Sequence, residues 1–263
     1  MNTSETSHPI QIECSDGIAT IRFNRPQALN AISVAMAESF LVSVKDIASD
    51  STVRAVILAG AGKGFMAGGG LPTLRANPVK GASALIRSMN EAVLLLERMD
   101  TPVIAQVHGV AAGAGLSLML NADFVLAADD ARFNLAYIHL GTWCDVGASW
   151  FLPRLVGLRK ALEIAMLSEV LDAKQAQELG LVNRAVPAAD LEKEVRMLAE
   201  RLARGPTLAY GAMKRLLRSS FQNSLADSLR EEKEAFVRCA GTQDFRAGVE
   251  AFLDKKAVRS KGQ

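Results

Sequence analysis

The sequence is short of cysteine and aromatic residues, and it carries little net charge. Its 3 cysteines show no CxxC spacing and cannot all pair with one another, which argues against a disulfide framework and favours a reducing compartment such as the cytoplasm. The net charge of +2 argues against a broadly basic surface for nucleic acid. No His/Cys/Asp cluster has metal-ligand spacing, so we expect no metal.

A secretion signal and a membrane span are also missing from the pattern. The first nine residues are polar and contain no apolar signal core, so we expect no secretion. Residues 103–128 are strongly apolar, but Gln106, His108, Asn121 and several glycines interrupt them. A strand, turn, helix and strand buried in a globular core explain this segment better than a membrane span. Hydrophobic residues at 49% and charged residues at 22% fit a globular protein.

Two glycine-rich turns carry most of the information. Residues 60–71 read GAGKGFMAGGGL and residues 109–116 read GVAAGAGL, and each turn follows a short apolar run, 53–58 and 102–107 respectively. The order strand, glycine turn, helix points backbone N–H groups at a ligand. Two such turns aimed at one oxygen would form an oxyanion hole without any side chain. A dinucleotide fingerprint is not met, because no acidic residue follows at the required distance in a βαβ setting.

The remaining pattern predicts an α/β core at 1–195 followed by a helical region at 196–263. A hairpin is expected at the N-terminal end, and Ser33 and Asp172 are expected to cap helices. The expected strands are 10–14, 18–23, 53–58, 102–107, 124–127, 131–133 and a brief one within 181–186. The expected helices are 33–49, 82–99, 115–121, 191–202, 206–217, 224–239 and 242–253, with a loop or short helix at 71–81.

Four segments resemble motifs of the crotonase, or enoyl-CoA hydratase/isomerase, superfamily. They are RPQALNA at 25–31, the two glycine turns, and the segment 173–187 that contains LGLVN. The resemblance runs from about residue 10 to about residue 256. It implies a crotonase-like spiral of repeated ββα units with a C-terminal helical trimerisation region. It also implies a small-molecule acyl-CoA thioester as substrate, no further cofactor, and a homotrimer or a hexamer built as a dimer of trimers. The charge and the apolar pattern discussed above lead us to expect no nucleic acid and no membrane as partner.

The resemblance also implies roles for individual residues. Matching the turns position by position places the two oxyanion-hole donors on the amides of Gly69 and Ala114. The resemblance implies that the coenzyme A entrance is bordered by Arg25, Ala28 and Leu29. It implies that the substrate site is lined by Ala67, Gly68, Gly70, Leu71, Val110, Gly113 and Tyr137. It also implies that a neighbouring subunit's adenine site is reached by Phe252 and Lys255. Lys255 also fits a solvated tail charge, and Tyr137 also fits simple packing.

The chain departs from the family pattern where the reaction is decided. Family hydratases use two glutamates, and the matching positions here are Ser117 and Tyr137. A serine hydroxyl and a phenol are poor bases at neutral pH, so efficient water addition is poorly supported. Gly70 replaces the usual acidic residue of the first turn, which would either widen the pocket or weaken the activity.

One carboxylate remains in the relevant stretch. Asp145 opens the segment DVGASWFLPRLVG at 145–157, which is similar to the branch that isomerises epoxide thioesters in phenylacetate breakdown. A single carboxylate suits a proton shift in which one base takes a proton from one carbon and returns it to another. Trp143, Val146 and Trp150 are expected to raise the acid's pKa by desolvation. The alternative interpretation is that Asp145 only caps a helix over 146–155.

Other functions stay open beside the leading hypothesis of an acyl-CoA isomerase. A weak enoyl-CoA hydratase is the first alternative. An aryl-CoA dehalogenase would use Asp145 as a nucleophile and, by the family resemblance, a histidine from the preceding helix, where the sequence has Asn90 and no histidine. A non-catalytic binding homologue, including an RNA-binding one, is the third, and the near-neutral charge argues against it.

Overall fold

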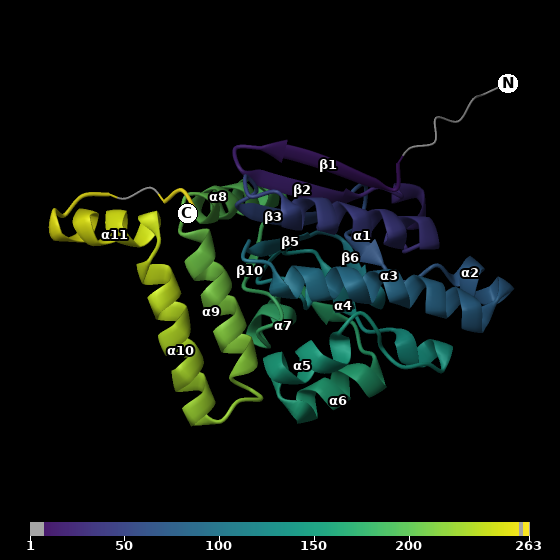
Figure 1. Cartoon of the computed structure of the whole chain (residues 1–263). Coiled ribbons are helices and arrows are strands. Elements are labelled where there is room, and N and C mark those ends of the chain that lie inside the picture. Colours follow the sequence, from purple (N-terminus) through teal and green to yellow (C-terminus); the bar gives the residue numbers. More distant parts are fainter. Residues whose placement is uncertain (1–7, 258–259, 263) are drawn as a thin grey trace, which may run out of the picture.

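Two β-sheets surrounded by helices make up the molecule (Figure 1). The computed structural model describes residues 8–257 and 260–262, so most of the segment on which the expectation of no secretion signal rests lies outside the described residues. The six-stranded sheet has the order β1-β2-β3-β5-β7-β10, and the four-stranded sheet has the order β4-β6-β8-β9. The strands are β1 (Ile10–Ser15), β2 (Ile18–Phe23), β3 (Ala55–Gly60), β4 (Met66–Ala67), β5 (Val103–Val107), β6 (Val110–Ala112), β7 (Phe124–Ala128), β8 (Arg132–Asn134), β9 (Leu171–Asp172) and β10 (Arg184–Val186).

The strands follow a repeating path between the two sheets. β3, β5 and β7 pair in parallel in the large sheet, and each is followed by a short strand (β4, β6, β8) that pairs in parallel in the small sheet. The helices are α1 (Val34–Ser49), α2 (Leu71–Ala76), α3 (Pro78–Arg98), α4 (Ala114–Met119), α5 (Ala148–Val156), α6 (Leu158–Leu167), α7 (Ala173–Glu178), α8 (Leu191–Ala203), α9 (Thr207–Ser219), α10 (Leu225–Ala240) and α11 (Gln243–Leu253), with 3₁₀ turns η1 (Pro26–Ala28), η2 (Tyr137–Leu140) and η3 (Ala188–Asp190). This arrangement is the α/β spiral of ββα units that the family resemblance implies.

The local signals predict most helix starts correctly. Ser33 accepts a hydrogen bond from the Met36 amide at the start of α1, and Asp172 forms the expected capping box with Gln175. The helix expected from residue 82 begins earlier, because Asn77 caps it. α6 was not predicted. No helix in the described part of the chain combines the length and the apolar character that a membrane crossing needs.

The core has two parts, one on each face of the large sheet. α1 and α3 cover one face, where Phe23 packs against Phe40 and Phe65 with ring centroids 5.3 and 6.0 Å apart. α8 covers the other face with an apolar stripe that includes Leu191 and Val195. The predicted division at residue 195 therefore falls inside a helix that packs on the sheet. α9, α10 and α11 extend beyond this core (Figure 1).

The two glycine turns lie against each other, which fixes the place of the site. Gly68 has a φ of +88°, and a Cβ added there would lie 3.4 Å from the Ala112 carbonyl oxygen. A Cβ at Gly115 would overlap the carbonyl oxygen of Met66. Only glycine allows this close approach of the start of α4 to β4. The turn after β3 and the turn after β5 therefore converge on one point.

Candidate active site

A small cavity of about 120 Å³ lies where the glycine turns meet the segment 137–146. The first turn contributes Gly69 and Leu71, and α4 contributes Ala114. Tyr137 of η2 and Asp145 from the loop before α5 complete the polar part. The other lining residues are Ile32, Leu74, Ala82, Leu85, Ile86, Met89, Leu140, Thr142, Trp143 and Val146, which are nearly all apolar.

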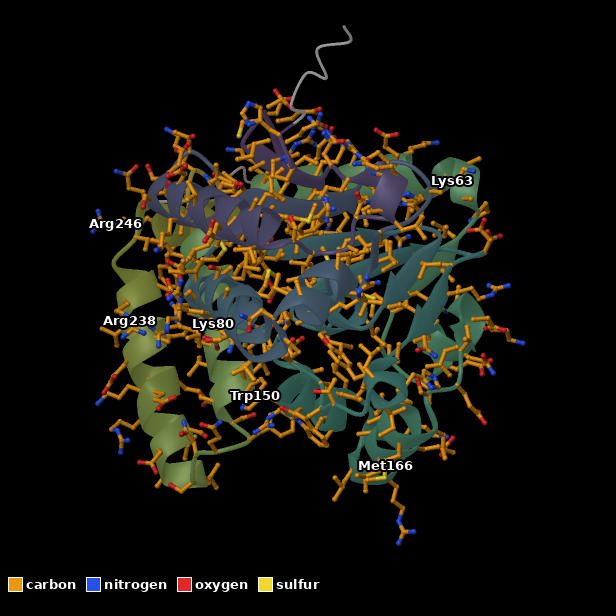
Figure 2. All side chains as sticks on the ribbon, turned by 90° about the vertical axis from the view of Figure 1, so that its right-hand side faces the viewer. Lys63, Lys80, Trp150, Met166, Arg238 and Arg246 are labelled. Atoms are coloured by element: carbon orange, nitrogen blue, oxygen red, sulfur yellow. The ribbon has the colours of Figure 1, made fainter. Side chains whose placement is uncertain are left out.

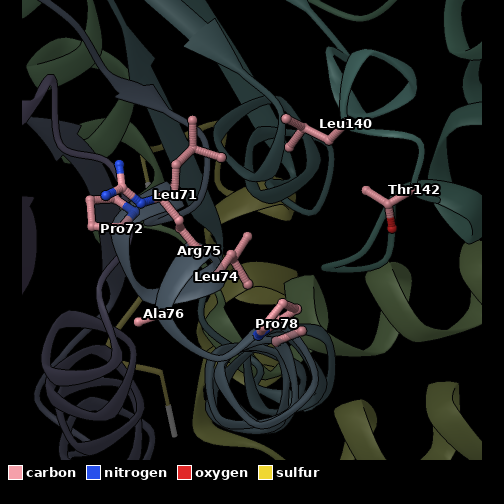
Figure 3. Close-up of a pocket in the computed structure, with 9 residues that line it drawn as sticks. Leu71, Pro72, Leu74, Arg75, Ala76, Pro78, Leu140 and Thr142 are labelled. Carbon is pink, nitrogen blue, oxygen red and sulfur yellow. The ribbon is translucent and has the colours of Figure 1, made fainter.

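A larger cavity of about 1010 Å³ adjoins the small one. The two share Leu71, Leu74, Ala82, Leu140 and Thr142. In Figure 3, Leu140 and Thr142 stand on one side of this space, with the residues of α2 on the other. A long, thin molecule can therefore place one end beside Asp145 while the rest of it extends toward the surface.

Gly69 and Ala114 both line the small cavity. Ala114 is the first residue of α4, after the N-cap Gly113, so its N–H has no partner within the helix. A Cβ added at Gly69 would meet nothing within 4 Å, so the backbone there borders open space. Among the described residues, no backbone hydrogen bond outside the helices and strands uses either amide as donor. Their role as a pair of oxyanion donors remains a prediction.

Three side chains form a hydrogen-bonded row, of which Tyr137 and Asp145 line the cavity and Ser117 is buried behind them. The Tyr137 phenol donates to Oδ1 of Asp145, and the Ser117 hydroxyl lies 3.1 Å from the phenol oxygen. Burial raises the pKa of Asp145, while the hydrogen bond from Tyr137 opposes that rise. Burial, followed by the nearby Asp145 charge, raises the pKa of Tyr137 far above its usual range. Asp145 is therefore the group in this row that can act as a base, and Tyr137 stays protonated.

The capping interpretation of Asp145 is wrong. α5 begins at Ala148, and its N-cap is Gly147, which has a left-handed backbone. The carboxyl group of Asp145 instead accepts from Tyr137 in the cavity wall. The side chain is thus directed to the site and not to a helix end.

Trp150 does not surround Asp145, contrary to the sequence prediction. The guanidinium of Arg154 lies 4.0 Å over its ring. Trp150, which is labelled in Figure 2, lines a different cavity, of about 550 Å³, together with residues of α9. Trp143 does line the site but is 66% exposed, so it stands at the rim. Val146 is the one of the three that is both buried and part of the cavity lining, and its effect on the pKa of Asp145 remains a prediction.

The residues expected at the coenzyme A entrance lie together at η1. Leu29 accepts a hydrogen bond from the Ala67 amide at 2.9 Å, which joins this segment to the first glycine turn. Arg25 donates to the carbonyl of Ala31 at 2.6 Å. Ala28 lies between them in the 3₁₀ turn. The remaining expected lining residues, Gly68, Gly70, Val110 and Gly113, belong to the two converging turns and β6.

Phe252 and Lys255 are not brought to this cavity. They lie at the end of α11, which is on the opposite side of the molecule from α2 (Figure 1). Phe252 is 85% exposed. A contribution of these residues to a neighbouring subunit's site requires such a position outside their own core, and that contribution remains a prediction.

The sequence analysis missed one polar residue of this region. Asn121 is buried after α4 and donates to the carbonyls of Ser117 and Val146. The sequence feature that could have identified Asn121 was a single amide side chain between apolar neighbours at the end of the predicted helix 115–121. The row from Ser117 through Tyr137 to Asp145 also went unpredicted, because the three residues were weighed one at a time.

Comparisons with known proteins agree with the geometry. A family model described as Enoyl-CoA hydratase/isomerase matches residues 13–263. A protein of Escherichia coli named 1,2-epoxyphenylacetyl-CoA isomerase is 37% identical, covering 94% of this chain and 96% of the relative. A probable enoyl-CoA hydratase of Rhodobacter capsulatus is 34% identical, with 97% and 99% covered. A crystal structure of a putative enoyl-CoA hydratase/isomerase from Mycobacterium abscessus superposes with a TM-score of 0.91 at 32% identity, covering 97% of this chain and all of that one.

Proposed function

The chain belongs to the enoyl-CoA hydratase/isomerase family, with its crotonase fold, and within that family we propose that it is an acyl-CoA isomerase in which Asp145 moves a proton along the acyl chain. One observation carries the proposal. Asp145 is the only carboxylate among the described residues that line the small cavity, which we call the inner cavity, and it shares that cavity with Gly69 and Ala114. A single base beside two backbone donors suits formation and collapse of an enolate.

The proposed reaction uses each of these groups once. The thioester oxygen lies between the amides of Gly69 and Ala114, which stabilise the negative charge of the enolate. Tyr137 holds Oδ1 of Asp145, so we assign the proton transfer to Oδ2. Oδ2 takes a proton from one carbon of the acyl chain and returns it to another. The same carboxylate is acceptor and donor, so the reaction needs no cofactor beyond the thioester itself.

The alternative chemistries lack a required group. Hydration needs a second acid or base, and the two matching positions hold a buried serine and a phenol that stays protonated. The dehalogenase alternative is supported by sequence similarity, because a protein of Arthrobacter named 4-chlorobenzoyl coenzyme A dehalogenase-2 is 31% identical to this chain. In this chain Asn90 is exposed on α3 and does not line the cavity, so none of the described α3 residues that line it supplies a base in place of the histidine.

Product analysis tests the proposal directly. The protein is incubated with enoyl-CoA thioesters in deuterated water, and proton NMR follows the double bond and the α-protons. An isomerase moves the double bond and exchanges protons without forming a hydroxyacyl product. A β-hydroxyacyl thioester as the main product would overturn the proposal, and so would the absence of exchange with every enoyl thioester tried.

Replacing Tyr137 by phenylalanine is expected to shift the pH dependence of the reaction. The phenol's hydrogen bond lowers the pKa of Asp145, so its loss lets burial raise that pKa further. A base must be deprotonated, and the rate therefore rises with pH through this pKa. The rising limb of the kcat profile should move to higher pH in Y137F, with a loss of about tenfold on the acid side that shrinks as the pH increases.

Ser117→Ala is the matched control for this change. It removes the other hydroxyl of the row, which contacts Tyr137 and is not hydrogen-bonded to Asp145. We expect the acid limb to stay near its wild-type position in this variant. Equal shifts in both variants, or no shift in Y137F, would show that Tyr137 does not act on Asp145.

We propose that the protein assembles as a trimer or as a hexamer of paired trimers. α9, α10, α11 and the turn between α9 and α10 expose large apolar side chains, among them Met213, Leu217, Phe221, Leu225, Leu229, Phe236 and Phe252. A single subunit leaves this surface in water, and a symmetric assembly would bury it. Light scattering at micromolar concentration should give three or six times the monomer mass. A monomeric mass would contradict the prediction.

A further inference from the structure

We propose that Asn121 is a positioning residue that holds Asp145 against the substrate through the turn 145–148. The inference rests on the proposed role of Asp145 as the base. It concerns a residue that contacts neither the cavity nor the carboxyl group itself.

The backbone after Asp145 has an unusual conformation. The Asp145 carbonyl accepts from the Ala148 amide at 3.2 Å, and the two central residues, Val146 and Gly147, have φ values of +53° and +81°. Two central residues with positive φ define a type I′ turn, where glycine, asparagine and aspartate are preferred. Valine is β-branched, and a left-handed backbone at such a residue is strained. The turn therefore needs support from its surroundings.

Asn121 supplies contacts that bind this turn to α4. Its Nδ2 donates to the carbonyl of Val146 at 2.9 Å and to the carbonyl of Ser117 at 2.8 Å. The side chain is buried, and its Oδ1 finds no hydrogen-bond partner among the described residues. Leaving a buried amide oxygen without a hydrogen-bond partner costs stability. The Asn121 side chain nevertheless adopts the orientation in which its nitrogen makes both donated bonds and its oxygen makes none.

The two hydrogen bonds connect the two halves of the proposed chemistry. α4 begins at Ala114, whose amide is a proposed oxyanion donor, and the turn begins at Asp145. Asn121 thereby fixes the carboxylate relative to the thioester oxygen. Without the two hydrogen bonds of Asn121, the strained Val146 can relax toward negative φ. This change would displace the carboxyl group of Asp145 from its position in the cavity wall. Such a displacement affects the transition state more than thioester binding, because the thioester contacts the glycine turns and η1.

The experiment compares N121A and N121D with a control elsewhere in the fold. N121D keeps the size of the side chain but can donate at most one of the two hydrogen bonds, and none when it is ionised. Thr101→Val is the control, because it removes one buried hydrogen bond, which Thr101 donates to the Val53 carbonyl. Thr101 lies just before β5, whereas the second glycine turn lies after β5. We measure kcat and KM for α-proton exchange, and the melting temperature.

Both Asn121 variants are expected to lower kcat by about 10- to 100-fold. KM should change by less than about threefold, because the binding contacts remain. T101V should keep kcat within about twofold of the wild type despite a lower melting temperature. Equal kcat losses in T101V and N121A, or a loss confined to KM, would overturn the proposal.

A second change tests the mechanism. Glycine adopts positive φ without strain, so adding Val146→Gly to N121A should raise kcat at least about fivefold over N121A alone. No recovery would mean that Asn121 does not act by supporting this turn. If the wild type itself exchanges no proton, the proposed function fails, and crystal structures of wild type and N121A then decide the placement. An unmoved Asp145, still bonded to Tyr137, would refute the inference on its own.

Discussion

Asp145→Asn is expected to lower exchange of the α-proton with deuterated water by about a hundredfold or more. The amide keeps the shape of the carboxylate but cannot take a proton, and the inner cavity offers no second carboxylate among the described residues. Mass spectrometry of the recovered thioester measures deuterium uptake. Binding of a non-reacting acyl-CoA should stay within about threefold of the wild type, because the proposed oxyanion donors are backbone amides.

Asp130→Asn is the control for this substitution, since it makes the same chemical change at an exposed carboxylate. We expect it to leave exchange unchanged. Ser117→Ala should cost far less than Asp145→Asn. The mechanism is wrong if Asp145→Asn exchanges at the wild-type rate while Tyr137→Phe abolishes exchange.

The pH dependence of the wild type follows from the same carboxylate. Burial raises the pKa of Asp145 above the value of an ordinary aspartate. Asp145 therefore begins to take up a proton at a higher pH than an exposed aspartate does. Exchange should therefore fall as the pH drops through this raised pKa. The loss should begin at a higher pH than an exposed aspartate would give, because burial of the carboxyl group disfavours its charged form.

Sequence patterns predicted the parts of this structure that depend on neighbouring residues. Ser33 caps α1 as expected, because an N-cap bond reaches only three residues ahead. The helices from residue 191 onward begin and end close to the predicted positions, because apolar spacing and turn residues mark them locally. The convergence of the two glycine turns was expected from the family resemblance, and the fold contains it.

The contacts around Asp145 could not be read from sequence spacing. Trp150 is five residues from Asp145, yet the turn at Val146 and Gly147 and the start of α5 direct it to a different cavity. Tyr137 is eight residues away and contacts the carboxylate directly. The path of the backbone, through η2 for Tyr137 and through a type I′ turn for Trp150, decides which of them meets Asp145. Valine at a positive φ is not a local preference, and tertiary contacts such as those of Asn121 are needed to produce it.

Ala114→Pro is expected to lower kcat by about 100- to 1000-fold, the loss typical of removing one oxyanion-hole donor. Proline has no N–H, and it is tolerated at the first position of a helix, where the N–H has no intrahelical partner. Ala114 occupies that position in α4. The substitution can thus delete a proposed catalytic donor while the helix persists. The preceding Gly113 has no Cβ to clash with the proline ring.

Leu225→Pro is the matched control, because Leu225 is the first residue of α10, follows the N-cap Ser224 and is exposed. The same substitution at a helix start outside the cavity should leave exchange unchanged and α10 folded. Circular dichroism and melting temperature report whether either variant loses structure. A folded Ala114→Pro protein that exchanges protons at the wild-type rate would remove Ala114 from the proposed oxyanion hole. A strong loss of kcat in that variant alone would tie the negative charge of the enolate to the amide at the start of α4, because the side chain of Ala114 carries no polar group that could account for it.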